Sequence, residues 1–114
     1  ILAAIAQQLP IRGMAHITGG GLPENLPRCL SAGHSIQLDL TSWQIPAAFQ
    51  WLAKAGNVAP VDMFNTFNMG IGYVVIVPAT AADESIAFFK SQGIEGYAIG
   101  TVVAGDRSLL GIPQ

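Results

Sequence analysis

Hydrophobic and polar positions along the chain follow two periods. Residues 34–40 carry isoleucine or leucine at every second position, which is typical of a strand with one buried face. Three short apolar runs predict further strands, at residues 12–18, 69–78 and 96–105. We expect the β-branched run that Pro78 ends to be the central strand of the sheet.

Helical segments separate these strands, and proline or glycine marks their ends. The expected helices are residues 1–9, a short helix or turn at 23–33, and residues 46–56, 60–68 and 80–93. Pro23 stands where proline is favoured, at a first helical position. Thr80 and Asp83 have the spacing of a capping box. The residues after 105 are expected either to fray or to begin another element.

This alternation of helices and strands predicts the fold class. It indicates an α/β or α+β domain with helices packed on a mixed sheet. The chain has 114 residues and contains no repeat, low-complexity segment or internal linker, so we expect residues 1–114 to form one domain.

The amino-acid composition limits which kinds of molecule this chain is expected to bind. Hydrophobic residues make up 51% of the chain and charged residues 11%, where about 25% is usual. We therefore expect part of the surface to be covered by another domain or subunit, although a well-buried α/β domain would also account for it. The five basic residues are scattered, which argues against nucleic acid as a partner. No apolar run reaches the length of a membrane span.

The first ten residues, ILAAIAQQLP, read like the end of a helix already under way. They contain no initiator methionine, capping residue or signal-peptide charge pattern. We expect the chain to be a piece of a longer protein whose missing part lies on the N-terminal side. Its one cysteine, Cys29, fits a reducing compartment and is interpreted as a small buried thiol.

Three consecutive glycines, Gly19, Gly20 and Gly21, carry the strongest candidate chemistry. The segment lacks the third glycine of a dinucleotide fingerprint and the lysine of a P-loop. A strand, three glycines and a helix start remain, which suits either an anion held by backbone N–H groups or a tight structural turn. The residues alone leave these two interpretations open. A structural zinc site is rejected, because Cys29 and the two histidines show no repeated ligand spacing.

Polar neighbours of the glycines extend this candidate site. His16 lies near the mouth of the loop, where it could donate to an anion or transfer a proton, or could be a core histidine. Thr18 could bind a ligand or cap the turn. Asn25 and Arg28 are three apart, so a helix could place them on one face, with Arg28 suited to a phosphate or carboxylate.

A second feature, FNTFNMGIG at residues 64–72, lies at a helix-to-strand junction. Asn68 could cap the end of the helix or aim its amide into a cleft, with Gly70 beside it.

Together, GMAHITGGGLPENLPR and FNTFNMGIGYVV resemble the C-terminal half of the phosphoribosylformylglycinamidine cyclo-ligase family, also called aminoimidazole ribonucleotide synthetases. The resemblance covers essentially the whole chain. It implies a three-layer α/β/α fold with a mixed sheet, as the C-terminal domain of a longer enzyme whose N-terminal ATP-binding domain is absent here. It also implies a cytoplasmic homodimer that uses ATP and Mg²⁺ to close formylglycinamidine ribonucleotide to aminoimidazole ribonucleotide in purine biosynthesis. Neither ligand is expected on this chain alone, which we expect to fold but not to turn over.

The resemblance also assigns roles to the candidate residues. It implies a catalytic role for His16, substrate or phosphate binding by the glycine loop with its flanking residues, and a facing wall across the cleft. The implied binding residues are Thr18, Gly19, Gly20, Gly21, Asn25, Arg28, Asn68 and Gly70, with no metal ligand among them. Two other readings stay open: a non-catalytic binding domain, and a sister ATP-dependent enzyme of the same superfamily.

Overall fold

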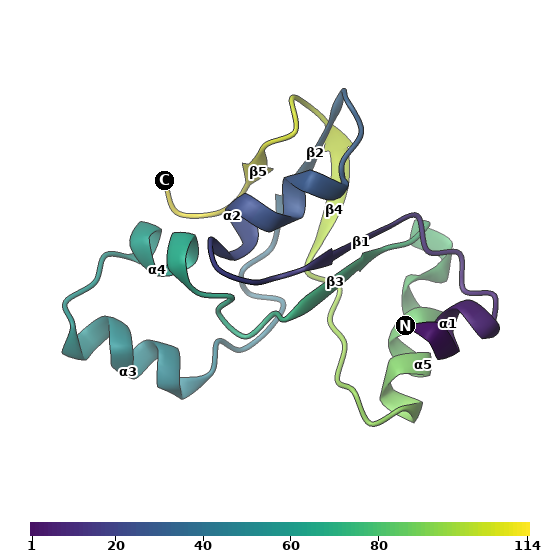
Figure 1. Ribbon diagram of the computed structural model, residues 1–114, viewed down its shortest axis with the longest axis horizontal. Helices are drawn as coiled ribbons and strands as arrows, with labels where there is room; N and C mark the ends of the chain where they lie inside the picture. Colours follow the sequence, from purple (N-terminus) through teal and green to yellow (C-terminus); the bar gives the residue numbers. More distant parts are fainter.

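The computed structural model describes all residues from 1 to 114 (Figure 1). The α-helices are α1 (Leu2–Ala6), α2 (Gly21–Asn25), α3 (Ala47–Ala55), α4 (Pro60–Thr66) and α5 (Ala82–Ser91), with 3-10 turns at η1 (Leu26–Cys29) and η2 (Ala79–Ala81). The strands are β1 (Gly13–His16), β2 (His34–Leu38), β3 (Tyr73–Ile76), β4 (Gly100–Ala104) and β5 (Leu109–Leu110).

The strands form two sheets. β1 and β3 make an antiparallel pair, and β4, β2 and β5 make a mixed sheet in that order, antiparallel on one side of β2 and parallel on the other. The α/β class and the mixed sheet are therefore confirmed. The expected central position of the 69–78 strand is wrong, because β3 pairs with β1 alone. A β-branched run indicates burial in a sheet but does not show how many neighbours the strand has.

Pairing of β1 with β3 brings the two sequence motifs side by side. His16 lies opposite Tyr73, and the Ile17 amide donates to the Gly72 carbonyl at 2.9 Å. The glycine loop that follows β1 thus begins beside the turn that precedes β3.

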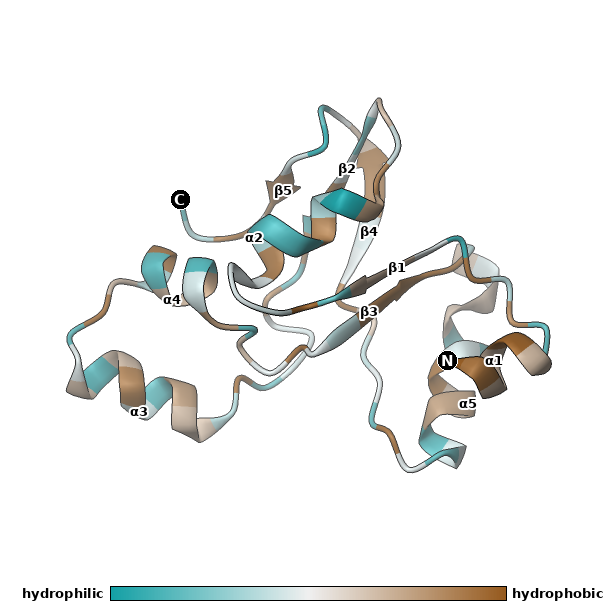
Figure 2. Ribbon diagram, in the orientation of Figure 1, coloured by the Kyte–Doolittle hydropathy of each residue, from teal (hydrophilic) through white to brown (hydrophobic).

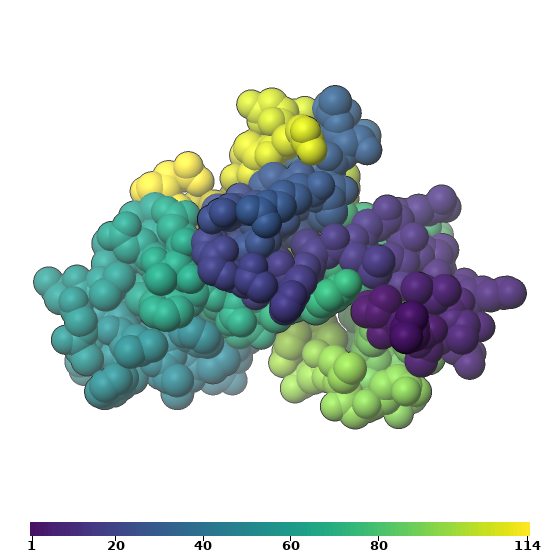
Figure 3. Space-filling view, viewed as in Figure 1, coloured from purple at the N-terminus to yellow at the C-terminus, as the bar shows by residue number.

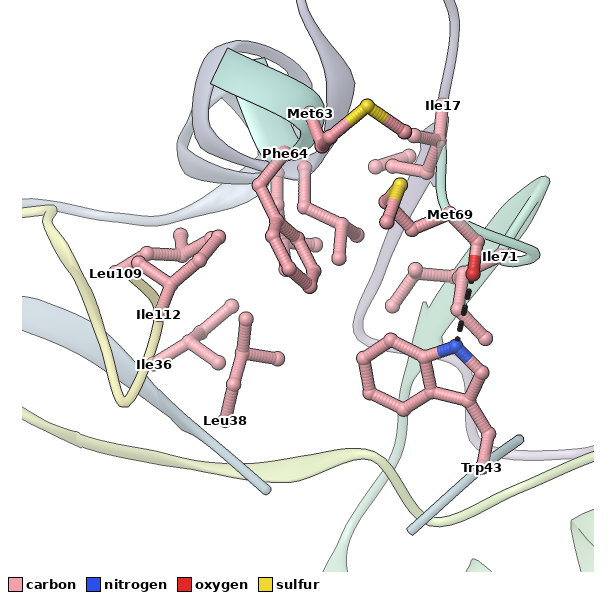
Figure 4. Packing of buried hydrophobic residues seen from close by; sticks show 14 of the residues in the cluster. Ile17, Ile36, Leu38, Trp43, Met63, Phe64, Met69, Ile71, Leu109 and Ile112 are labelled. Atoms are coloured by element: carbon pink, nitrogen blue, oxygen red, sulfur yellow. Dashed lines mark hydrogen bonds between the residues drawn. The ribbon is translucent and has the colours of Figure 1, made fainter. Parts of the chain in front are cut away.

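One hydrophobic cluster of 15 buried residues joins these elements (Figure 4). It includes Leu22 of α2, Phe64 of α4 and Ile36 of β2. Trp43 closes the cluster, and its indole Nε1 donates to the Met69 carbonyl at 3.0 Å. The core therefore fixes β1, α2 and the turn before β3 relative to one another.

Several helix boundaries differ from the sequence prediction. α1 ends at Ala6 rather than near residue 9, and Gln8 takes a left-handed conformation with φ of 59°. α2 begins two residues before Pro23, since Gly20 at φ of 93° turns the chain directly into the helix. The capping box does not form: Ala81 precedes α5 and no side chain caps it, because the turn η2 occupies residues 79–81.

The segment after β4 begins another element and does not fray. Leu109 and Leu110 form β5, which pairs in parallel with β2, and Leu109 and Ile112 belong to the buried cluster.

The molecule is elongated, with principal extents of 44, 34 and 22 Å. α3 and α4 lie at one end, α1 and α5 at the other, and the strands lie between them (Figures 1 and 3). Brown, apolar segments reach the outside of α1 and α3 (Figure 2), where Leu2 is 85% and Trp51 67% exposed. None of the helices has the length and apolar character needed to span a membrane.

Candidate functional site

A cavity of about 360 Å³ lies between β1 and the α2–η1 segment. Its walls bring together four of the residues that the sequence analysis singled out: His16, Thr18, Asn25 and Arg28. The remaining lining residues are Met14, Ala15 and Cys29. The loop with the three glycines connects the two walls.

Strand alternation determines which β1 side chains face outward. Met14, His16 and Thr18 are exposed, whereas Ala15 and Ile17 are buried in the core. The His16 ring stacks on Tyr73 of β3, with ring centroids 6.1 Å apart and planes at 30°. This histidine is therefore an exposed residue at the cavity and not a core histidine.

Asn25 holds the glycine loop from inside. Its side chain is 4% exposed, and its Nδ2 donates to the carbonyls of Thr18 at 3.3 Å, Gly19 at 3.2 Å and Gly21 at 2.8 Å. Its Oδ1 accepts from the Thr18 hydroxyl at 3.2 Å. A buried amide that satisfies several backbone carbonyls fixes their directions.

By holding the loop carbonyls, Asn25 also determines where the loop N–H groups point. In a trans peptide the carbonyl points opposite to the following N–H, so the Gly19 and Gly20 amides point away from Asn25. Neither amide donates a hydrogen bond within the chain. The loop thus has two unused donors, although none of the three glycines is among the residues that line the cavity.

Arg28 stands at the edge of the same cavity. Its Nη1 donates to Asn25 Oδ1 at 3.3 Å and its Nη2 to Glu24 Oε1 at 3.1 Å. A guanidinium has five donors, so most of them remain available. Asn25 therefore orients both the loop and the arginine.

The three glycines have different surroundings. A side chain at Gly21, where φ is 64°, would collide with the Phe64 carbonyl of α4. One at Gly20 would collide with Glu24, and one at Gly19 would meet no atom within 4 Å. Close packing within the chain explains why positions 20 and 21 are glycine, but it does not explain why position 19 is.

Asn68 and Gly70 do not line the cavity. Asn68 Oδ1 accepts from the Gly70 amide at 2.9 Å and so stabilises the turn before β3. Gly70 takes φ of 101° and packs against Pro46. This turn leads into β3, which pairs with the strand that carries His16.

Comparison with known proteins agrees with this architecture. A family model described as "AIR synthase related protein, C-terminal domain" matches residues 1–112. The chain belongs to this family. The resemblance inferred from the two motifs is thereby confirmed.

Curated relatives of this AIR synthase C-terminal domain carry the name phosphoribosylformylglycinamidine cyclo-ligase. The protein from Synechococcus elongatus is 60% identical over 113 residues, which are 99% of this chain and 33% of the relative. Those from Thermosynechococcus vestitus and a Picosynechococcus are 58% and 56% identical, over 99% and 98% of this chain and 33% of each relative. The chain thus spans about a third of the length of the curated relatives it matches.

Cys29 lines the cavity of this AIR synthase C-terminal domain without the features of a nucleophile. Its Sγ donates to the Leu26 carbonyl at 3.0 Å, and partial burial raises the pKa of the thiol. Both effects favour the neutral thiol, but Cys29 is only partly buried, so the expected buried thiol is not found.

No three His, Cys, Asp or Glu side chains gather closely enough to hold an ion. Arg28 is the one arginine or lysine among the residues that line the cavity.

Sequence reasoning missed Met14, Ala15 and Tyr73 as parts of the site. The strand period could have indicated Met14, which lies two residues before His16 on the same face. Tyr73 could not be predicted from the sequence, because its place beside His16 depends on the register of β1 with β3.

Proposed function

We propose that this chain is the C-terminal domain of an ATP-dependent cyclo-ligase that closes formylglycinamidine ribonucleotide to aminoimidazole ribonucleotide. The support is 60% identity to a relative of that name across 99% of the chain. In this proposal the complete protein works in the cytoplasm as a homodimer, and an N-terminal domain supplies most contacts to ATP and Mg²⁺.

The cavity beside the glycine loop would bind a phosphate group of the ribonucleotide or of ATP. The observation that carries this proposal is the meeting of His16, Thr18 and Arg28 in one cavity whose two walls are joined by a loop with two unused amides. Arg28 can offer two parallel donors to a phosphate. The Gly19 and Gly20 amides can donate to the same group, and Gly21 packs the loop against α4.

The other candidate residues would have supporting roles. Thr18 can donate its hydroxyl to the ligand in exchange for its bond to Asn25. Asn68 and Gly70 would shape the facing wall by holding the turn before β3. The His16 imidazole can accept or donate a proton, which suits a reaction that releases protons from nitrogen.

The proposed reaction needs an activated leaving group. ATP would phosphorylate the formyl oxygen, the amine nitrogen would then attack the formyl carbon, and the oxygen would leave with the phosphate. Mg²⁺ would supply charge neutralisation on the phosphates when bound. This chain's contribution would be to hold a phosphate with Arg28 and the loop and to accept a proton at His16.

A chimera tests this proposal. The corresponding third of the Synechococcus elongatus cyclo-ligase is replaced by this chain, and ATP-dependent ring closure is measured. We expect an active chimera in which His16→Ala lowers kcat/KM by about 10²- to 10⁴-fold. Arg28→Gln should raise KM about tenfold or more, whereas Lys54→Gln, a matched loss of an exposed charge on α3, should have no effect. Unchanged kinetics in both cavity variants would remove this cavity from the active site.

A further inference from the structure

The carboxylate of Glu24 lies between two parts of the candidate site. Its Oε1 accepts from Arg28 Nη2 at 3.1 Å. Its Oε2 lies against Gly20, at the place where a side chain on that glycine would collide with it. A negative group of this protein therefore stands beside both the arginine and the glycine loop.

This contact is easily exchanged. The side chains of Arg28 and Glu24 are 66% and 59% exposed, and ion pairs between such solvated groups are weak. The second contact of Arg28, from Nη1 to Asn25 Oδ1, is independent of Glu24. Arg28 can thus exchange Glu24 for another anion while Asn25 continues to orient it.

We propose that Glu24 is an autoinhibitory partner of Arg28, which competes with the ligand's phosphate and so lowers the affinity of the site. This inference rests on the proposed function, because it takes Arg28 as the phosphate contact. A phosphate monoester carries up to two charges and three acceptor oxygens, so it can displace a single carboxylate from a forked guanidinium. Breaking the pair costs the same for every anion that replaces Glu24, so the pair lowers the affinity of all of them by one common factor.

Titration of this chain with inorganic phosphate, followed by amide NMR signals, tests the inference. We expect Arg28→Gln to weaken binding at least fivefold. Glu24→Gln should lower the Kd for phosphate about two- to fivefold, because it removes the competing partner. Glu24→Asp should lower it too, since the shorter side chain keeps its charge but loses its reach to Arg28.

A matched variant separates competition from general charge. Glu84 is also an exposed glutamate in the first turn of a helix, α5, which lies at one end of the molecule while α2 lies near the middle (Figure 1). Glu84→Gln should leave the Kd unchanged, and an equal tightening there would show a general charge effect and overturn the inference.

The outcomes distinguish this inference from the proposed function. Weaker binding by Arg28→Gln together with unchanged or weaker binding by both Glu24 variants overturns the role of Glu24 alone. Equal binding by wild type and Arg28→Gln, or no binding by wild type and Glu24→Gln, overturns the proposed phosphate contact and the inference with it.

Discussion

Gly19, Gly20 and Gly21 are adjacent in the chain but stand in three different environments. Gly21 packs its backbone against α4, Gly20 turns the chain under Glu24, and Gly19 has open space where a side chain would be. Two of the three are therefore required by the fold itself. Gly19 is the one whose small size has no cause within the chain, which is the property expected of close approach by a ligand.

Alanine substitutions should distinguish a glycine that the fold requires, Gly21, from one that the fold does not require, Gly19. Gly21→Ala should lower the free energy of unfolding by about 2 kcal/mol or more, from the left-handed φ and the collision with Phe64. Gly19→Ala should change it by less than about 0.5 kcal/mol, because the site is open. Urea unfolding of both variants measures this. Equal losses at the two positions would contradict the assignment.

The candidate residues were predictable from the sequence where local spacing decides their position. His16 and Thr18 share a strand face by alternation, and Asn25 and Arg28 share a helical face. The sequence could not show whether Asn25 holds the glycine loop or binds a ligand. Only the three carbonyl contacts show that its side chain faces the loop. Asn68 could be placed at its turn, but its distance from the cavity depends on tertiary packing.

Among the elements, β5 shows how tertiary contacts override a weak local signal. Residues after 105 lack a long apolar run, yet Leu109 and Ile112 complete the core beside β2. β3 shows the opposite case: its β-branched sequence strongly predicts a central strand, yet it pairs with only one neighbour, β1. Element type thus followed from periodicity, whereas the number of neighbours did not.

We expect β5 to contribute to stability through one of its two leucines. Leu109 is 8% exposed and Leu110 41%. Leu109→Ala should destabilise the chain by about 2–3 kcal/mol, through lost burial and a residual cavity. Leu110→Ala should cost less than about 1 kcal/mol, which makes it the matched control. Similar unfolding midpoints for the two variants would mean that the segment does not pack against β2.

The whole molecule is more open than a typical domain of its size. Its radius of gyration is 14.5 Å, where about 13 Å is expected for this length. Large apolar side chains are exposed on α1 and α3, among them Leu2 and Trp51, and after α5 at Ile94. With a charged fraction of 11%, this surface fits the proposal that further parts of a longer protein cover it.

For the same reason we expect the isolated chain to fold without catalysing ring closure. The chain spans about a third of the length of the curated relatives it matches, and its cavity carries one arginine against the several charges of a nucleoside triphosphate. A coupled assay should detect no ATP-dependent product above background, while circular dichroism shows a cooperative unfolding transition. The Synechococcus elongatus cyclo-ligase, assayed alongside, establishes that the conditions support turnover. Ring closure by the 114-residue chain alone would show that these residues suffice for the chemistry, and it would contradict the assignment of ATP and Mg²⁺ binding to another domain.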